Sequence, residues 1–361
     1  MRRVLLFLIL FMTPVWAFAL EVSAEHAILI DADSGRALYS KNAGERADIA
    51  STTKIMTAFL ALQTADTAER VTIKREHTLV EGTRVYFKEG DVLTVEELLV
   101  GTLLQSGNDA ALALADHCGG SEGAEGFVRA MNDLARQLGM ENTSFANPHG
   151  LNDDNHYSTA EDMAILTRSA LNNAAFAAIV SRKTGSVGSM AVRNHNRMLW
   201  NYEGSNGVKT GYTKKAGRCL VSSAERGGQT LIAVTLNAPS DWNDHTRMLD
   251  FGFNNYPARR LATRDAFICE LPVVSGVGGA VDVRVRDTLS CVLTEDETRF
   301  VRGEVELPRF VWAPVGQGET VGLIRFTLNG EVIGRSELYA AAAVPEIVKR
   351  SLWARMFRRL M

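Results

Sequence analysis

The residues best suited to covalent chemistry lie in the stretch Ser51-Thr52-Thr53-Lys54. Lys54 opens a run with no further charge until Asp66, which is typical of a helix buried on most sides. Residues three apart on a helix share a face, so the Ser51 hydroxyl and the Lys54 amine can meet. Burial disfavours the charged form of a lysine, and an uncharged amine can take the serine proton. The pattern therefore indicates a nucleophile, Ser51, and its general base, Lys54.

A simpler interpretation makes Ser51 the N-cap of this helix and sends Lys54 into solvent. A capping box would place Glu or Gln at position 54, and lysine does not fit that pattern. Ser51 can also cap the helix and still be the nucleophile, so the two roles need not compete.

A second short motif, Ser106-Gly107-Asn108, has the composition of a turn that follows a helix. Ser106 can relay a proton to a leaving amine, and Asn108 can hold a substrate amide. The alternative is that Asn108 serves only the turn, because Ser-Gly-Asn is good turn chemistry by itself.

A third motif, Lys209-Thr210-Gly211, lies in a strand pattern. Lys209 and Thr210 offer a cation and a hydroxyl, a pair suited to a substrate carboxylate. Gly211 has no side chain, so a substrate backbone can lie against the strand. Free backbone N–H groups at a helix start can stabilise an oxyanion, which makes the amide of Ser51 a candidate donor, and the edge of the strand can supply a second donor from the amide of Tyr212.

The segments around these motifs predict an α+β domain: a mostly antiparallel sheet formed from its two ends and covered by helices. Residues 26–43 predict two strands joined by a turn at Asp33-Ser34-Gly35, and residues 71–80 have strand-like character. Thr94 and Glu97 form a capping-box signature. Helices are expected from residue 51 and over 94–105, 110–117, 126–138, 159–171 and 244–251, with strands over 208–238.

The pattern changes near residues 255 to 260. Short alternating segments and the hairpin signal Asn329-Gly330 predict a small all-β domain from there on. The predicted division is a signal peptide over 1–19, a catalytic domain over 20–256, a β-rich domain over 257–343 and an amphipathic helix over 344–361.

Both termini carry targeting features. Arg2 and Arg3, an apolar stretch and Ala17-Phe18-Ala19 are typical of a secretory signal peptide, and a retained anchor is the alternative. The tail VPEIVKRSLWARMFRRLM predicts a basic amphipathic helix suited to an anionic membrane surface. The alternative is a helix docked on the protein's own core.

Composition excludes several classes of function. With 361 residues, 46% of them hydrophobic and a net charge of −3, the chain can fill a large core and gives no reason to expect nucleic-acid binding. Its seven histidines show no H-E-x-x-H spacing, so we expect neither a metal nor another cofactor. Its four cysteines are expected to be free thiols, although a Cys269–Cys291 bridge stays open.

Together the three motifs make the chain similar to the low-molecular-mass penicillin-binding proteins that are serine-type D-Ala-D-Ala carboxypeptidases, peptidase family S11. The resemblance extends to IDADSGRALYSKNA, NPHGL, SNGVKTGYTKKAGRCLVSSA and MLDFGF, and to the order of the domains. It implies a β-lactamase/transpeptidase-like catalytic domain on the outer face of the cytoplasmic membrane. One departure concerns an arginine that some relatives carry before the closing helix: here that loop reads SDWNDHTR, and Arg247 falls inside the predicted helix.

The resemblance implies that Ser51 attacks the bond between the last two D-alanines of a peptidoglycan stem peptide, and that β-lactams acylate the same serine. Lys54 matches the family's general base, and Tyr212 lies where the family uses a backbone oxyanion donor. The family's remaining site residues are matched here by Ser106, Asn108, Lys209 and Thr210. The alternatives are a DD-endopeptidase, a β-lactamase and a non-catalytic wall-binding protein. The β-lactamase is disfavoured because Glu161-Asp162-Met163-Ala164-Ile165 does not match the E-x-x-L-N loop of class A enzymes.

Overall fold

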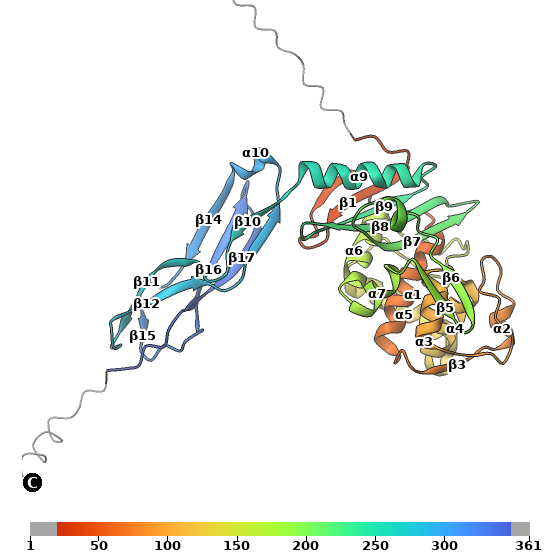
Figure 1. Ribbon diagram of the computed structural model, residues 1–361, viewed down its shortest axis with the longest axis horizontal. Helices are drawn as coiled ribbons and strands as arrows, with labels where there is room; N and C mark the ends of the chain where they lie inside the picture. Colours follow the sequence, from red (N-terminus) through yellow and green to blue (C-terminus); the bar gives the residue numbers. More distant parts are fainter. Residues whose placement is uncertain (1–19, 348–361) are drawn as a thin grey trace, which may run out of the picture.

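The computed structural model describes residues 20–347, which form two parts that follow one another along the chain (Figure 1). The N-terminal part is built on a five-stranded sheet in the order β2-β1-β9-β8-β7. Each neighbouring pair is antiparallel. The strands come from both ends of this part, as predicted: β1 His26–Asp31, β2 Ala37–Lys41, β7 Ser205–Thr213, β8 Gly217–Arg226 and β9 Gln229–Leu236.

Helices cover the two faces of this sheet unequally. Alternate side chains of a strand point to opposite faces, and β1 shows the division. Ile28 and Ile30 belong to the large core shared with most of the helices, whereas Ala27 and Leu29 pack with Met248 of α9. The helices of the first face are α1 Lys54–Thr64, α3 Val95–Leu103, α4 Asn108–Cys118, α5 Gly123–Leu138, α6 Ala160–Leu171 and α7 Ala174–Val180. The second face carries α9, Asp241–Asn255.

The start of the first helix differs from the prediction. Ser51 lies in a 3₁₀ turn, η1 Ala50–Thr53, and α1 begins only at Lys54. Neither helix has a side-chain cap, and the N-cap positions are Ile49 and Thr53, so the alternative in which Ser51 is the N-cap does not hold. The capping box at the start of α3 is confirmed, because the Thr94 hydroxyl accepts a hydrogen bond from the Glu97 amide at 3.1 Å.

Shorter elements fill the connections. The strand-like prediction for residues 71–80 holds only for β3, Arg70–Thr72, because the chain then turns into α2, Arg75–Thr78. There His77 is buried and faces Asp116 at 3.4 Å. The other short elements are β4 Val92–Thr94, η2 Gly120–Glu122, α8 Met198–Asn201 and the hairpin of β5 Thr184–Val187 with β6 Met190–Arg193.

The C-terminal part is β-rich, as predicted, and has its own apolar core. A six-stranded sheet runs in the order β14-β16-β17-β12-β11-β15, and β10 pairs with β13. Asn329 and Gly330 form the turn between β16 and β17, which confirms the hairpin signal. The strands are β10 Ala258–Ala262, β11 Phe267–Val274, β12 Ala280–Val285, β13 Leu289–Val292, β14 Val301–Glu306, β15 Val311–Trp312, β16 Thr320–Leu328 and β17 Glu331–Ala340. One helical turn, α10 Glu295–Thr298, opens with a capping box that the sequence reasoning missed.

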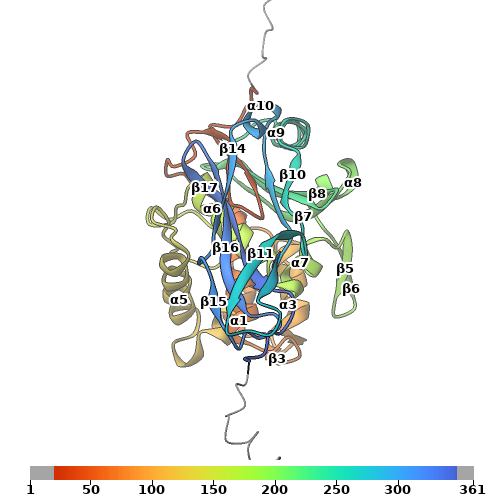
Figure 2. The ribbon, with the colours of Figure 1, turned by 90° about the vertical axis from the view of Figure 1, so that its left-hand side faces the viewer.

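The two parts meet at the hairpin of β1 and β2. Arg36 donates to the carbonyl of Val292 at 2.7 Å and forms an ion pair with Glu297. Figures 1 and 2 accordingly show α10 close to one end of α9.

All four cysteines are free thiols, so the Cys269–Cys291 bridge that the sequence left open does not form. The predicted signal peptide lies outside the described residues, as do residues 348–361 of the predicted amphipathic helix. The prediction that this helix begins at residue 344 is wrong, because Val344 pairs with Val315 and Glu346 with Gly276. Within residues 20–347, no single helix is long and apolar enough to span a membrane. The helices α6 and α7 reach that length and apolar composition only when taken together, and the chain bends by 108° between them.

Candidate active site

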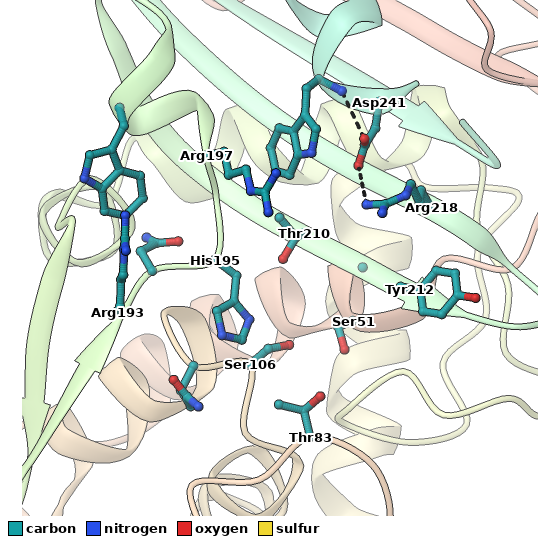
Figure 3. Close-up of a pocket in the computed structure, with 15 residues that line it drawn as sticks. Ser51, Thr83, Ser106, Arg193, His195, Arg197, Thr210, Tyr212, Arg218 and Asp241 are labelled. Atoms are coloured by element: carbon teal, nitrogen blue, oxygen red, sulfur yellow. Dashed lines mark hydrogen bonds and ion pairs between the residues drawn. The ribbon is translucent and has the colours of Figure 1, made fainter. Parts of the chain in front are cut away.

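The structure brings the three motifs together around one cavity of about 730 Å³. Ser51 enters it from η1, Ser106 from the connection between α3 and α4, and Thr210 from β7 (Figure 3). Gly211 and Tyr212 complete the contribution of β7 to the wall. Lys54, Asn108 and Lys209 do not line the cavity and are almost fully buried beneath it.

Lys54 contacts three oxygen atoms. Its Nζ lies 3.0 Å from the Ser51 hydroxyl, 2.7 Å from Oδ1 of Asn108 and 2.6 Å from the carbonyl oxygen of His149. Burial lowers the pKa of Lys54 well below its usual value, and the nearby cation of Lys209 lowers this pKa further, against an opposing effect of Asp109. The predicted meeting of the Ser51 and Lys54 side chains is thus present in the structure.

The loop Asn147–Leu151, which contains the NPHGL segment, holds the start of α1 in place. Thr57 of α1 donates to the carbonyl of Pro148 at 2.5 Å. Gly150 packs so closely on η1 that a Cβ added there would lie 2.0 Å from the carbonyl oxygen of Ala50. Since Gly150 also has φ +89°, glycine is required on both steric and conformational grounds. This loop therefore fixes both the η1 backbone and the His149 carbonyl that Lys54 contacts.

Strand β7 lies against η1 on its other side. A Cβ added to Gly211 would come within 3.1 Å of the Ser51 amide nitrogen, so the missing side chain permits this close approach. Lys209, on the same face of the strand as Gly211, donates to the Thr210 carbonyl at 2.8 Å. Lys209 is only 1% exposed, and burial lowers its pKa to about 7.

Asn108 is engaged on both sides of its amide. Oδ1 contacts Lys54, and Nδ2 donates to the carbonyl of Glu81 at 2.6 Å. The sequence predicted that Asn108 binds an amide group of the substrate, and it did not predict the contact between Asn108 and Lys54. Ser106, which precedes it by two residues, has φ +62° and is 6% exposed. Backbone strain of this kind is common at functional sites.

Several residues of the cavity wall were missed by the sequence reasoning. Arg218 of β8 pairs with Tyr212 of β7 in the sheet register and lies 3.7 Å from Asp241 at the start of α9. Arg197 also lies close enough to Asp241 to lower the pKa of that carboxyl, although burial raises it overall. Arg247 is inside α9, as predicted, and donates to the Glu21 carbonyl at 3.4 Å. The other wall residues that were missed are Thr83, Gln105, Arg193, Asn194, His195, Trp200 and Trp242.

The chain is similar in sequence and in fold to known D-alanyl-D-alanine carboxypeptidases. Residues 13–240 match the family "D-alanyl-D-alanine carboxypeptidase" (peptidase S11), and residues 256–346 match "Penicillin-binding protein 5, C-terminal domain". D-alanyl-D-alanine carboxypeptidase DacF of Bacillus subtilis is 33% identical over 94% of this chain and 89% of its own length. The corresponding DacC of Escherichia coli is 34% identical, over 93% of this chain and 90% of its own length.

Among solved structures, penicillin-binding protein 5 from Haemophilus influenzae superposes with a TM-score of 0.74 at 28% identity, over 90% of this chain and 98% of that one. The likeness covers both structural parts and supports the α+β transpeptidase-like fold followed by a β-rich domain. The chain belongs to the peptidase S11 family of D-alanyl-D-alanine carboxypeptidases, the low-molecular-mass penicillin-binding proteins.

Proposed function

We propose that this chain removes the terminal D-alanine from peptidoglycan stem peptides through an acyl-enzyme on Ser51, with Lys54 as the general base. The observation that carries the proposal is the set of three contacts around the Lys54 amine. A neutral amine has two N–H bonds and one lone pair. Two of the contacted oxygens, of the Asn108 amide and the His149 carbonyl, can only accept. When both take an N–H, the lone pair is left for the Ser51 hydroxyl proton.

Burial keeps Lys54 available in this neutral form. A fully buried lysine loses the hydration of its charge, and a second buried cation disfavours that charge further. Both effects act on Lys54. Lys209 thus acts on the base itself, because its charge, buried beneath the strand, lowers the pKa of Lys54.

The reaction runs in two stages. Ser51 Oγ attacks the carbonyl between the two D-alanines while Lys54 accepts its proton, and the amides of Ser51 and Tyr212 stabilise the oxyanion. A proton returned through Ser106 lets D-alanine leave as an amine. Water then hydrolyses the ester on Ser51 and frees the shortened peptide. A β-lactam forms the same ester at Ser51 when its ring opens.

The substrate's terminal carboxylate is assigned to Thr210, Arg218 and Arg197. Lys209 is buried and engaged with a backbone carbonyl, so it is poorly placed to present its cation to the cavity. Arg218 and Arg197 instead line the cavity on the side of Thr210 and share one acidic neighbour, Asp241 (Figure 3). Two guanidinium groups around the single carboxylate of Asp241 leave a net positive charge that can bind the carboxylate of the substrate.

The rival activities of the same fold differ in their later steps. In a class A β-lactamase a glutamate promotes rapid deacylation, but here Glu161 lines a separate cavity with Ile28 and Arg168. Slow hydrolysis of the penicilloyl enzyme is expected, and turnover of many penicillin molecules per second would instead identify a β-lactamase. Cleavage of cross-linked stem peptides would identify an endopeptidase activity at the same serine.

The assay for the proposed function is release of D-alanine from a diacyl-Lys-D-Ala-D-Ala peptide. Ser51→Ala should abolish both release and labelling by a fluorescent penicillin. Ser189→Ala, which changes an exposed serine in the β5–β6 turn, should leave both unchanged. Labelling of the Ser51→Ala protein at the normal rate would exclude Ser51 as the nucleophile, and a wild type that labels but releases no D-alanine would favour a wall-binding role.

The placement of the protein in the cell follows from its termini. Residues 1–19 are assigned to a signal peptide, 20–256 to the catalytic domain, 257–347 to the β-rich domain and 348–361 to a membrane-anchoring amphipathic helix; residues 344–347, predicted as the start of that helix, pair with the β-rich part instead. The substrate lies outside the cytoplasmic membrane, which supports export. The separate apolar cores of the two parts support the internal boundary. The five basic residues of the tail, with its Trp and Phe, support attachment to an anionic surface.

A further inference from the structure

Exposed apolar side chains gather at one end of the β-rich part, where the described chain ends. Trp312 is 66% exposed, Val277 57%, Ile347 51% and Phe310 45%. Phe310 and Trp312 also pack edge to face, with their ring centroids 5.8 Å apart. These four residues are called the tip patch below.

Backbone pairing holds the tip patch together. Trp312 of β15 pairs with Val274 at the end of β11. The segment that follows β11 pairs with the last described residues, because the amide of Ile347 donates to the carbonyl of Ser275 at 2.7 Å. Val277 belongs to the same segment and donates to the carbonyl of Pro345 at 3.0 Å. The tip patch is therefore one surface made from three separate stretches of sequence.

The chemistry next to the tip patch is cationic and aromatic. Arg309 is exposed and adjoins Phe310 in the sequence. Directly after Ile347 the chain enters residues 348–361, whose basic residues are Lys349, Arg350, Arg355, Arg358 and Arg359 and whose aromatic residues are Trp353 and Phe357. Trp side chains favour the boundary between lipid and water, and basic residues are attracted to anionic headgroups. An anionic lipid surface suits both features at once.

We propose that the tip patch itself inserts into the headgroup region of an anionic membrane, beside the segment 348–361. The β-rich part then stands on the membrane by its apolar end, in addition to any attachment through the tail. Figure 1 shows β15 and the end of the described chain at the far end of the β-rich part from α9. The active-site cavity, which includes Trp242 of α9, is consequently held away from the lipid surface.

The opposite end of the same part supplies a matched control. Phe300, just after α10, is 60% exposed, yet Figure 1 places α10 at the other end of the β-rich part from β15. Exposure alone would give Phe300 the same membrane affinity as Trp312. Trp312, unlike Phe300, lies beside the other residues of the tip patch, one of which, Ile347, directly precedes the segment 348–361. We therefore expect only the tip patch to bind the membrane.

The test measures sedimentation of the full-length chain with vesicles of phosphatidylglycerol and phosphatidylethanolamine. The double variant Phe310→Ser/Trp312→Ser should bind about tenfold or more weakly, because two aromatic rings are lost from the interface. Phe300→Ser should bind as the wild type does. All three proteins should release D-alanine at the same rate and melt at the same temperature, which separates this inference from the proposed catalytic function.

Two outcomes would overturn the proposal. One is equal binding of the wild type and the double variant, which is expected if the tail folds back over the tip patch or if the tip patch stays in water. The other is a wild type that does not bind these vesicles at all.

Fluorescence gives a second, independent measurement. Vesicles with brominated acyl chains quench tryptophans that enter the lipid, so Trp312→Phe should lower the quenched fraction of the emission. Phe300→Trp should add emission that is not quenched, while Trp353 contributes equally in every variant. An unchanged quenched fraction in Trp312→Phe would contradict insertion of the tip patch.

Discussion

Replacing Lys209 by methionine tests the electrostatic role assigned to this buried lysine. Methionine preserves most of the apolar volume and removes the charge. In the folded protein the pKa of Lys209 is lowered from 10.5 to about 7, because the side chain is fully buried. Between these two pH values the unfolded chain therefore binds about one proton more at this residue than the folded chain does. Stability must rise with pH across that window, since the folded pKa lies below the unfolded one.

The size of this effect follows from the shift. One bound proton contributes about 1.4 kcal/mol per pH unit to the free energy of unfolding. Across a window of roughly 3.5 pH units the wild type should gain up to about 5 kcal/mol that Lys209→Met does not gain. Lys54 adds a pH dependence of the same sign, which is smaller in the variant because loss of the Lys209 charge raises the pKa of Lys54, so the difference between the two proteins reports Lys209 together with its effect on Lys54. Urea unfolding at pH 7, 8 and 9 measures the two slopes.

The same variant should change catalysis in a defined direction. Removing the Lys209 charge raises the pKa of Lys54, because that charge helps to lower it. The acid limb of the penicillin acylation rate should then move to higher pH. Lys214→Met, which removes an exposed lysine, should leave both the limb and the unfolding slope unchanged. Equal slopes for Lys209→Met and wild type, or an acid limb that moves to lower pH, would refute the argument.

Two further substitutions probe the geometry of the site. Gly150→Ala should cost about 3 kcal/mol or more in thermal unfolding and slow acylation, because its Cβ would collide with the Ala50 carbonyl. Gly90→Ala, at φ +88° with open space around it, should cost only about 1 kcal/mol, and an equal cost at both positions would rule out the collision. Arg218→Ala should lower kcat/KM about 10- to 100-fold for a D-Ala-D-Ala peptide with a free carboxylate, but much less for its C-terminal amide. An equal loss for both peptides would show that Arg218 does not bind the carboxylate.

The nucleophile and its base were predictable because their relation is local. Ser51 and Lys54 are one helical turn apart, and the apolar run after Lys54 already indicated the burial that lowers its pKa. The detail of the turn was not predictable. Ala50 adopts φ +46°, and η1 is shaped by Gly150, a hundred residues further along the chain. Capping propensity alone therefore could not decide whether Ser51 is the N-cap of this helix.

The rest of the site depends on contacts between distant segments. Lys54 donates to the backbone carbonyl of His149, and a pattern of side chains cannot predict which backbone carbonyl will accept a hydrogen bond. Arg218 reaches the cavity wall only through the register of β7 with β8, while Arg197 comes from the connection before α8. The spacing of Arg197 and Arg218 in the sequence does not indicate that both line the same cavity. The one available hint was that Arg218 belongs to the strand that follows the Lys209 motif.

The most direct test of the account is the rate at which benzylpenicillin acylates the wild type and Lys54→Met at neutral pH. If a neutral Lys54 takes the Ser51 proton, the second-order rate constant should fall at least about 1,000-fold in the variant, because the nucleophile loses its only activating base. A rate within about tenfold of the wild type would show that another group deprotonates Ser51, and it would contradict the central claim.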